Sequence, residues 1–338
     1  MKLRRYEGNP ILSPVADHPW ECLVNTNPGA WYDEERGEVL MLYRAAGDDP
    51  EHRIHFGLAT SKDGIHFERA SDQPILSPSV DGFDAGCVED ARIVKVEGWY
   101  VITYASRPFP PGQYWKTGPY VPPNFPRWFP WGIRENATST GLLLTQDFKT
   151  YIRAGRLTDP TTDDRDVILF PEKIGGRFAM MHRPMTWVGG SYGTEFPAMW
   201  ISFGDDLLSW GDSKLLAKAE YPWENQKIGG NTPPLKTDQG WLTLYHAVGE
   251  DRHYRLGAML LDLRNPSRVT HRTRDWILQP EEWYELEGYY AGVVFPCGSV
   301  ILKDTLHVYY GGADKYVGLA TCPMAELMDS LLSCPTGL

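Results

Sequence analysis

The segment Val39-Leu-Met-Leu-Tyr-Arg-Ala45, followed by a second segment that opens Gly57-Leu-Ala-Thr60, decides the fold because this pair recurs along the chain. An aromatic-rich hydrophobic strand precedes a strand of smaller residues in each copy. The other first segments span 99–106, 177–184, 240–248 and 305–314, and their partners begin at 141, 200, 256 and 317. A β unit that recurs at a spacing of roughly sixty residues is typical of radial β architecture. We therefore predict an all-β propeller with one blade for each pair.

Each first segment carries a polar residue at the end that would face the propeller axis. These residues are Arg44, Tyr104, Arg183, His246 and Asp314. Because a propeller brings equivalent strand ends together, we predict that the five side chains converge on one binding site.

The repeats run almost from end to end, so we interpret residues 1–338 as one catalytic domain. One segment, at about 107–137, breaks the pattern with closely spaced prolines and aromatics that cannot continue a central sheet. It is either an irregular surface loop packed by its own rings or an aromatic lid beside the site. Its position directly after the strand that contains Tyr104 favours the lid. A short amphipathic helix is expected from Met324 to Leu332.

The net charge of −11 would repel a nucleic acid over most of the surface, although a local basic pocket could still bind a small anion. The five cysteines are odd in number and form no CxxC pair, which favours reduced thiols. We found no signal peptide and no apolar run long enough for a membrane span. These features predict a soluble, cytoplasmic protein.

Two groups of charged residues suggest chemistry. Glu89, Asp90 and Arg92 enter a strand, where a carboxylate beside arginine is either half of a structural ion pair or a catalytic acid. Since adjacent strand residues point to opposite faces, we expect at most one of the two acids to face the axis.

The second group is basic and comprises Arg165, Arg183, Lys227 and His246. Each has a structural alternative, because Arg165, for example, could simply pair with a neighbouring aspartate. Gathered in one place, however, these side chains would repel one another unless an anion were present, and arginine and lysine suit phosphate. No metal-binding spacing and no glycine-rich phosphate loop before a helix is present, so we expect neither a metal nor a nucleotide cofactor.

An ordered series of short motifs resembles glycoside hydrolase family 130, the β-mannoside phosphorylases and related β-mannosidases. The motifs are Asn-Thr-Asn-Pro-Gly-Ala (25–30), Tyr-Arg-Ala (43–45), Glu-Asp-Ala-Arg-Ile (89–93), Leu-Phe-Pro-Glu-Lys (169–173), His-Arg-Pro-Met (182–185), Lys-Ile-Gly (227–229), Leu-Tyr-His-Ala-Val (244–248), Val-Phe-Pro-Cys-Gly (294–298) and Tyr-Tyr-Gly-Gly-Ala-Asp (309–314). The resemblance covers nearly the whole chain and implies a five-bladed β-propeller. The 107–137 insertion is not part of this pattern.

The resemblance also implies roles. Asp90 matches the family's general acid, which is thought to act through the mannose 3-hydroxyl. The positions that bind phosphate match Arg165, Arg183, Lys227 and His246. Arg44 and Asp314 match mannose-binding positions, to which Asn25 or Asn27 would add. The implied reaction is inverting phosphorolysis of a β-mannoside to α-mannose 1-phosphate and an acceptor sugar, with inorganic phosphate as co-substrate and no cofactor.

The motifs fit this reaction physically. An inverting glycosidase needs a second carboxylate to activate water, whereas phosphate is its own nucleophile and needs a cationic cradle instead. Two alternatives stay open: a β-mannosidase, with Glu172 or Glu195 as its base, and a non-catalytic sugar-binding propeller. The linkage cleaved, β-1,4 or β-1,2, and the acceptor sugar also stay open. Family members often assemble, so a homo-oligomer is possible.

Overall fold

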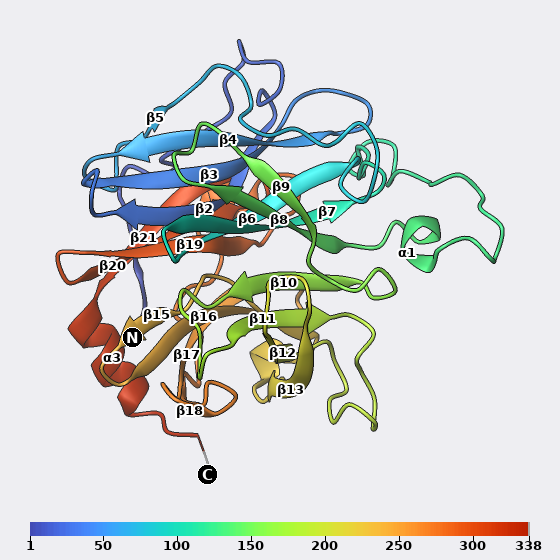
Figure 1. Cartoon of the computed structure of the whole chain (residues 1–338). Coiled ribbons are helices and arrows are strands. Elements are labelled where there is room, and N and C mark those ends of the chain that lie inside the picture. Colours follow the sequence, from blue (N-terminus) through green and yellow to red (C-terminus); the bar gives the residue numbers. More distant parts are fainter. Residues whose placement is uncertain (337–338) are drawn as a thin grey trace.

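The recurring segments form five β-sheets in succession, the first two of them joined into one eight-stranded sheet, in the computed structural model, which describes residues 1–336 (Figure 1). The first sheet contains β2 (Val24–Asp33), β3 (Glu38–Ala46), β4 (Ile54–Ser61) and β5 (Glu68–Arg69). The second contains β6 (Cys87–Val96), β7 (Trp99–Arg107), β8 (Ser139–Thr145) and β9 (Ile152–Arg156). The third contains β10 (Asp164–Leu169), β11 (Phe178–Pro184), β12 (Met199–Gly204) and β13 (Gly211–Ala217). A parallel pairing of Ile54 with Cys87 links the first two sheets.

The remaining two sheets complete a five-bladed β-propeller, as the sequence predicted. In the fourth, β14 (Lys227–Gly230) and β15 (Leu235–Thr237) both pair with β16 (Gly240–Val248), which is followed by β17 (Tyr254–Leu261) and β18 (Val269–Arg272). The fifth contains β19 (Val294–Leu302), β20 (Thr305–Gly312), β21 (Tyr316–Pro323) and β1 (Arg4–Arg5). Because β1 comes from the start of the chain and pairs with β21, the two ends of the chain jointly build the last blade.

The predicted strand pairs share one register. Four tyrosines of the second strands lie directly opposite glycines of the third strands: Tyr43 with Gly57, Tyr104 with Gly141, Tyr245 with Gly257 and Tyr310 with Gly318. A Cβ atom at Gly57 would lie 2.1 Å from the ring of Tyr43, and the other three glycines are similarly covered. The small residues that open the third strands therefore make room for the tyrosine rings.

Side chains from neighbouring blades fill the space between the sheets. One cluster, for example, joins Leu244 and Leu256 of the fourth blade to Val308 and Tyr310 of the fifth. The predicted helix is α3 (Met324–Leu332), which buries Leu327 and Leu331 against this cluster. The other helices are short: α1 (Trp131–Arg134), α2 (Trp283–Leu286) and the 3₁₀ helix Pro222–Glu224. Within residues 1–336, no helix has the length and apolar character that crossing a bilayer requires.

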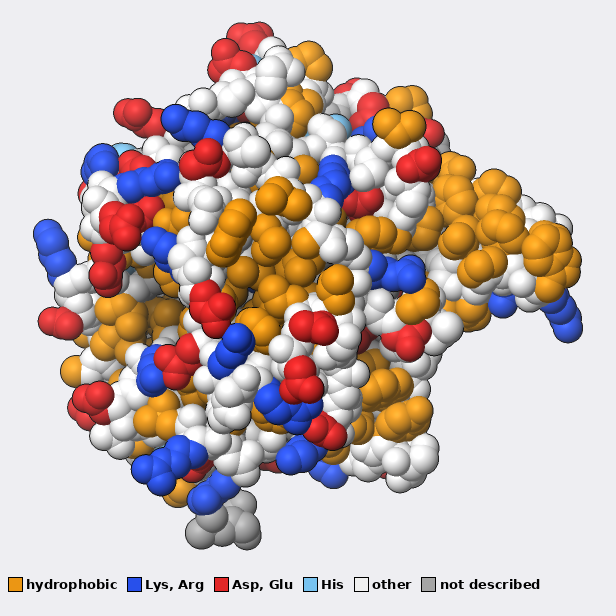
Figure 2. Space-filling model, viewed as in Figure 1, with side chains coloured by type: hydrophobic (Ala, Val, Ile, Leu, Met, Phe, Trp, Pro, Cys, Tyr) orange, Lys and Arg blue, Asp and Glu red, His pale blue; other side chains and the backbone are white. Residues whose placement is uncertain are grey.

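The insertion connects β7 to β8 and contains α1 as its only helix within the described chain. It projects from the body of the propeller (Figure 1), and apolar side chains cover much of the projecting part (Figure 2). Its rings pack on one another, since Phe109 stacks on Tyr120 and Phe125 stacks on Phe129 with centroids 5.8 and 4.6 Å apart.

Candidate active site

Three β-bulges on the innermost strands aim polar side chains at the propeller axis. Asn27 of β2, Asp90 of β6 and Asp166 of β10 each sit where two residues oppose one on the neighbouring strand. All three have positive φ angles, between 43° and 57°. Non-glycine residues rarely adopt this conformation, and bulges of this kind commonly redirect a side chain beside an active site. The backbone itself therefore marks this end of the propeller as the candidate site.

A cavity of about 510 Å³ opens at these bulges. Most of the predicted site residues line it: Asn27, Arg44, Asp90, Arg165, Arg183, Lys227 and Asp314. They come from all five blades, so the structure brings together groups that are up to 287 positions apart in the chain. The convergence that the sequence predicted is therefore present, although its membership differs in detail.

Asp90 is held at the cavity wall by two neighbours. Asn27 Nδ2 donates a 2.8 Å hydrogen bond to Asp90 Oδ1, and Arg44 Nη1 lies 3.5 Å from the same oxygen. Burial raises the pKa of Asp90 to about 6, although Arg44 acts in the opposite direction. An aspartic acid with this pKa keeps its proton in a useful fraction of molecules near neutral pH, as a general acid requires.

Glu89 also lines the cavity, which corrects the expectation that only one of the two adjacent acids would face the axis. The bulge at Asp90 interrupts the strand alternation on which that expectation rested. Glu89 Oε2 forms a 3.0 Å ion pair with Arg44. Burial opposes ionisation, but Arg44 and Arg107 together hold the pKa of Glu89 below its ordinary value. The two neighbouring acids thus have opposite tendencies: Glu89 stays ionised while Asp90 tends to keep its proton.

Asp166 organises the basic side of the cavity. Arg183 Nε donates to Asp166 Oδ2 at 2.5 Å, and Arg92 Nη2 and His246 Nε2 each lie 3.8 Å from its carboxylate. Arg92 also donates from Nη1 to the backbone carbonyl of Asp90 at 2.9 Å, which ties the two bulges together. Burial works against ionisation, but Arg183, together with the neighbouring His246 and Arg92, holds the pKa of Asp166 well below its usual range.

Lys227 and His246 lie on the same side. Lys227 Nζ contacts the hydroxyl of Tyr254, and burial together with Arg183 lowers the pKa of Lys227 to about 7. His246 is fully buried behind the cavity wall rather than on its lining, and burial lowers its pKa well below the ordinary value. Neither ring nitrogen of His246 has a hydrogen-bond partner within residues 1–336, and neither does Arg92 Nη2. Arg92 lines the cavity, so its Nη2 donor can face an anion there, whereas His246 lies behind the wall.

Arg165 has the structural partner that the sequence suggested as its alternative. Its guanidinium forms two hydrogen bonds with Asp163, at 2.7 and 2.9 Å, while its outer face still lines the cavity. The structural pair is therefore present, and the position of Arg165 leaves its phosphate-binding role a prediction, because a paired arginine keeps donors that can face a ligand.

Two predicted site residues lie elsewhere. Tyr104 is buried in the second blade and donates to Asp84 at 2.8 Å, because its neighbour Ala105 takes the position that faces the cavity. Asn25 is fully buried and donates to Glu21 at 3.0 Å. The prediction for Tyr104 was wrong by one residue, which in a strand exchanges one face for the other.

The two glutamates considered as a hydrolytic base are also outside the cavity. Glu172 forms a 2.6 Å ion pair with Lys236 at the surface. Glu195 lines a separate surface hollow together with Tyr221 and Asn225. Their positions remove the specific support that the sequence gave to the hydrolytic alternative.

Sequence reasoning did not name several residues that the cavity contains. Asp166 is the most consequential, and Tyr114, Tyr254, Tyr290 and Phe295 add aromatic surface. The insertion contributes further residues: Pro111, Tyr114, Pro119, Tyr120, Pro122, Glu135 and Asn136. It therefore forms one wall of the site, as the lid interpretation predicted. Asp166 could have been suspected from the sequence Asp163-Asp-Arg-Asp166, whose charges need buried partners.

Comparisons with known proteins agree with this geometry. The family model described as beta-1,4-mannooligosaccharide phosphorylase, for glycoside hydrolase family 130, matches residues 2–118 and 132–332. A 1,2-beta-oligomannan phosphorylase from Thermoanaerobacter sp. (strain X514) is 36% identical over 334 residues, covering 97% of this chain and 99% of the relative. A beta-1,2-mannobiose phosphorylase from the same strain is 34% identical over 331 residues, covering 94% and 96%.

A solved structure has the same fold. The beta-1,2-mannobiose phosphorylase from Listeria innocua, in complex with beta-1,2-mannobiose, superposes with a TM-score of 0.80 at 27% identity. The match covers 98% of this chain and all of the other. Since the family model and the relatives span nearly the whole sequence, the chain belongs to glycoside hydrolase family 130.

Proposed function

We propose that this protein is an inverting β-mannoside phosphorylase. The observation that carries the proposal is the division of the cavity into two sides. One side holds Asp90, whose pKa is raised to about 6, and the other holds Arg183, Arg92 and Lys227 around Asp166, with His246 buried behind them. One acid facing a cationic cluster meets the needs of phosphorolysis, in which the anion is itself the nucleophile.

The reaction would proceed in one displacement. Phosphate, held by Arg183, Lys227 and Arg165, would attack the anomeric carbon of the mannosyl group from the face opposite the leaving sugar. As the carbon–oxygen bond to that sugar breaks, the proton of Asp90 would pass to the glycosidic oxygen through the mannose 3-hydroxyl. The products are α-mannose 1-phosphate and a sugar shortened by one residue.

The surrounding residues would prepare this step. Arg44 and Asp314 line the same cavity and would bind the mannose hydroxyls, while Asn27 orients the Asp90 carboxyl through its 2.8 Å hydrogen bond. Positioning both reactants in this way supplies much of the rate enhancement, because the phosphate and the mannoside then react as if they were one molecule.

We also propose that the bond cleaved is a β-1,2 linkage, since two of the relatives described above act on β-1,2-mannosides and share more than a third of this sequence. Inorganic phosphate would be the co-substrate. The step needs no redox cofactor because no atom is oxidised or reduced. The five free cysteines support a cytoplasmic location. The exposed Trp128 and Val121 of the insertion would suit contacts in a homo-oligomer.

The experiment that tests the proposal is an assay of sugar 1-phosphate formation. Purified protein would be incubated with β-1,2- and β-1,4-linked mannobiose, with and without inorganic phosphate. We expect phosphate-dependent release of α-mannose 1-phosphate, faster from the β-1,2 substrate. Release of free mannose at the same rate without phosphate would instead identify a hydrolase.

A further inference from the structure

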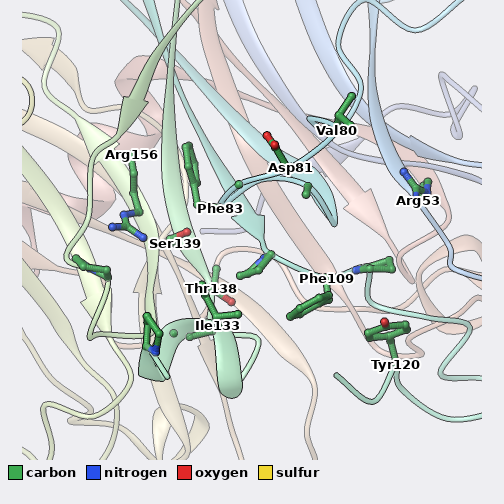
Figure 3. A pocket seen from close by; sticks show the side chains of 18 of the residues that line it. Arg53, Val80, Asp81, Phe83, Phe109, Tyr120, Ile133, Thr138, Ser139 and Arg156 are labelled. Atoms are coloured by element: carbon green, nitrogen blue, oxygen red, sulfur yellow. The ribbon is translucent and has the colours of Figure 1, made fainter. Parts of the chain in front are cut away.

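A second cavity, of about 750 Å³, lies beside the candidate active site (Figure 3). Five stretches of the chain and Tyr120 line it: 51–53 before β4, 80–85 before β6, 108–110 and 130–139 at the two ends of the insertion, and 156–162 from the end of β9 onward. Its volume is within the range of roughly 300–1,000 Å³ that is usual for small-molecule sites. None of the roles assigned so far uses this cavity.

The two cavities share a wall. Tyr120 and Thr138 line both of them, and the insertion residues on either side of these two face one cavity or the other. Pro111 and Asn136, for example, line the inner cavity, whereas Pro110 and Ala137 line the outer one. The two cavities are therefore adjacent, and a sugar chain that leaves the inner cavity beside Tyr120 and Thr138 would meet the outer one.

The lining of the outer cavity suits a sugar. Phe83, Phe109 and Tyr120 present aromatic rings, on which the apolar face of a pyranose can pack. Charged side chains of Arg53, Asp81 and Arg156 line the same space and offer donors and acceptors to hydroxyl groups. Figure 3 shows Phe109 next to Tyr120 on one side and Phe83 next to Arg156 on the other. A largely apolar surface with a few polar groups is the usual character of a ligand site.

The direction of the substrate also fits. In phosphorolysis, the mannosyl group that is transferred lies between Asp90 and the cations, so the leaving sugar must extend away from the cationic side. The insertion, with Tyr120, Glu135 and Asn136, forms the wall of the inner cavity that leads to the outer one. The sugars beyond the cleaved bond would therefore run toward Phe109 and Phe83.

We propose that the outer cavity binds the distal residues, on the leaving-group side, of β-mannosides longer than a disaccharide. This inference rests on the proposed function and adds to it a preference for chain length. A disaccharide ends inside the inner cavity, whereas a tetrasaccharide also contacts the outer rings.

The test compares the phosphorolysis of β-1,2-mannobiose with that of β-1,2-mannotetraose. For the wild type, Phe83→Ala and Arg156→Ala, kcat/KM would be measured with both substrates from the release of mannose 1-phosphate. We expect the ratio of kcat/KM for the tetrasaccharide to that for the disaccharide to fall about five- to tenfold in Phe83→Ala, the size of a lost aromatic contact. Arg156→Ala, whose side chain is exposed, should lower the ratio in the same direction and provides the test if Phe83→Ala does not fold.

Trp99→Ala is the matched control, because Trp99 is a partly exposed aromatic residue that lines neither cavity. It should leave the ratio unchanged. If Phe83→Ala and Arg156→Ala also left the ratio at its wild-type value while the wild type released mannose 1-phosphate, the outer cavity would not bind substrate and the proposed function would stand. If the wild type released no mannose 1-phosphate from either length, the proposed β-1,2 linkage and this inference would both be overturned.

Discussion

Asp90 combines a strained backbone with an unusual proton affinity. Its φ angle of 57° occurs in a bulge opposite Tyr104, and its carboxyl group lies partly buried beside Arg44. We expect Asp90→Asn to lower turnover by at least about 10²-fold, the scale of lost general acid catalysis. The asparagine keeps the shape of the side chain but has no acidic proton to donate. Mannose 1-phosphate release measures the loss, and an unchanged circular dichroism spectrum would show that the fold is kept.

The pH dependence follows from the same residue. A general acid works only in its protonated form, so kcat/KM should decline as the pH rises above about 6, where Asp90 loses its proton. Lys227 has a pKa of about 7 and loses its positive charge as the pH rises through that value. This loss should weaken phosphate binding and lower the rate further. A pH profile of phosphorolysis that rises from pH 6 to pH 8 would contradict both assignments.

We propose that Asp166 is a positioning residue, which would act on phosphate through the cations that it holds. Asp166→Asn would leave the buried Arg183 and Arg92 without their anionic partner, and loss of a buried partner commonly costs about 3–5 kcal/mol. We expect the free energy of unfolding to fall and the KM for phosphate to rise by about tenfold or more. Urea denaturation and initial rates at varied phosphate concentration measure the two effects.

The pH and a matched variant separate these effects. Because the pKa of Asp166 is depressed by folding, its contribution to stability is present above about pH 4, the ordinary aspartate value, and is lost as the pH falls further.

Asp163→Asn is the matched variant. It removes the partner of the partly exposed Arg165 instead, and should destabilise the protein less. An unchanged KM for phosphate in Asp166→Asn, despite lower stability, would reduce Asp166 to a structural role.

At this scale the sequence could predict which residues meet in the cavity but not the local geometry of the strands that carry them. The types of residue and their order were enough to group Asp90 with Arg183 and Lys227, and all three line the cavity. Strand alternation failed at Glu89 and Asp90 because a bulge inserts one residue and resets the alternation. A bulge depends on the opposing strand, which a local sequence pattern does not show.

At the scale of the elements, four blades repeat one buried arrangement. A tyrosine of the second strand lies beside an acid that pairs with an arginine of the outermost strand. The sets are Tyr43, Glu21 and Arg69; Tyr104, Asp84 and Arg153; Tyr245, Glu224 and Arg272; and Tyr310, Glu285 and Arg5. The third blade differs, because His182 takes the tyrosine position and bonds Asp164 and Ser202. Each arrangement fastens the outermost strand to the blade.

This repeat explains the error at Tyr104. Its true counterparts are Tyr43, Tyr245 and Tyr310, all of which point into their blades. The strand pairs themselves were predictable, because hydrophobic runs and small residues alternate visibly in the sequence. The relative alignment of the five copies was not predictable. In a strand that is hydrophobic on both faces, an offset of one residue leaves the hydrophobic pattern almost unchanged.

The arrangement in the fifth blade closes the ring and can be tested. Arg5 of β1 forms hydrogen bonds of 2.8 and 2.9 Å with the fully buried Glu285, which also accepts one from Tyr310. Arg5→Ala would leave this carboxylate without its cation, so we expect a loss of roughly 3 kcal/mol in the free energy of unfolding. Urea denaturation measures the loss.

The neighbouring Arg4→Ala is the matched control for Arg5→Ala. Arg4 forms an ion pair with Glu326 in which both side chains are largely exposed, and such pairs contribute little to stability. Equal urea midpoints for Arg4→Ala and Arg5→Ala would mean that the buried pair does not fasten β1 to the last blade.

At the scale of the whole molecule, the acidic surface and the basic interior have different consequences. The net charge of −11 is spread over the chain, whereas Arg92, Arg183 and Lys227 gather in one buried place. Mutual repulsion among these cations opposes folding, and a bound anion would relieve it. Three blades position this cluster together, because Arg92 comes from the second blade, Arg183 from the third and Lys227 from the fourth. Phosphate should therefore raise the thermal stability of the native protein, in addition to serving as a substrate.

Binding to the native state alone raises stability by about 2.7 kcal/mol when the ligand is at a hundred times its dissociation constant. We therefore expect phosphate at pH 7 to raise the Tm by several degrees above the value in sodium chloride of equal ionic strength. Lys227→Ala should remove most of this difference because it removes one of the cations that line the cavity. Lys236→Ala is the matched control, since Lys236 pairs with Glu172 at the surface and should leave the difference unchanged. A phosphate-dependent rise of equal size in both variants would mean that phosphate acts at the outer surface, and the cluster around Asp166 would then need another ligand.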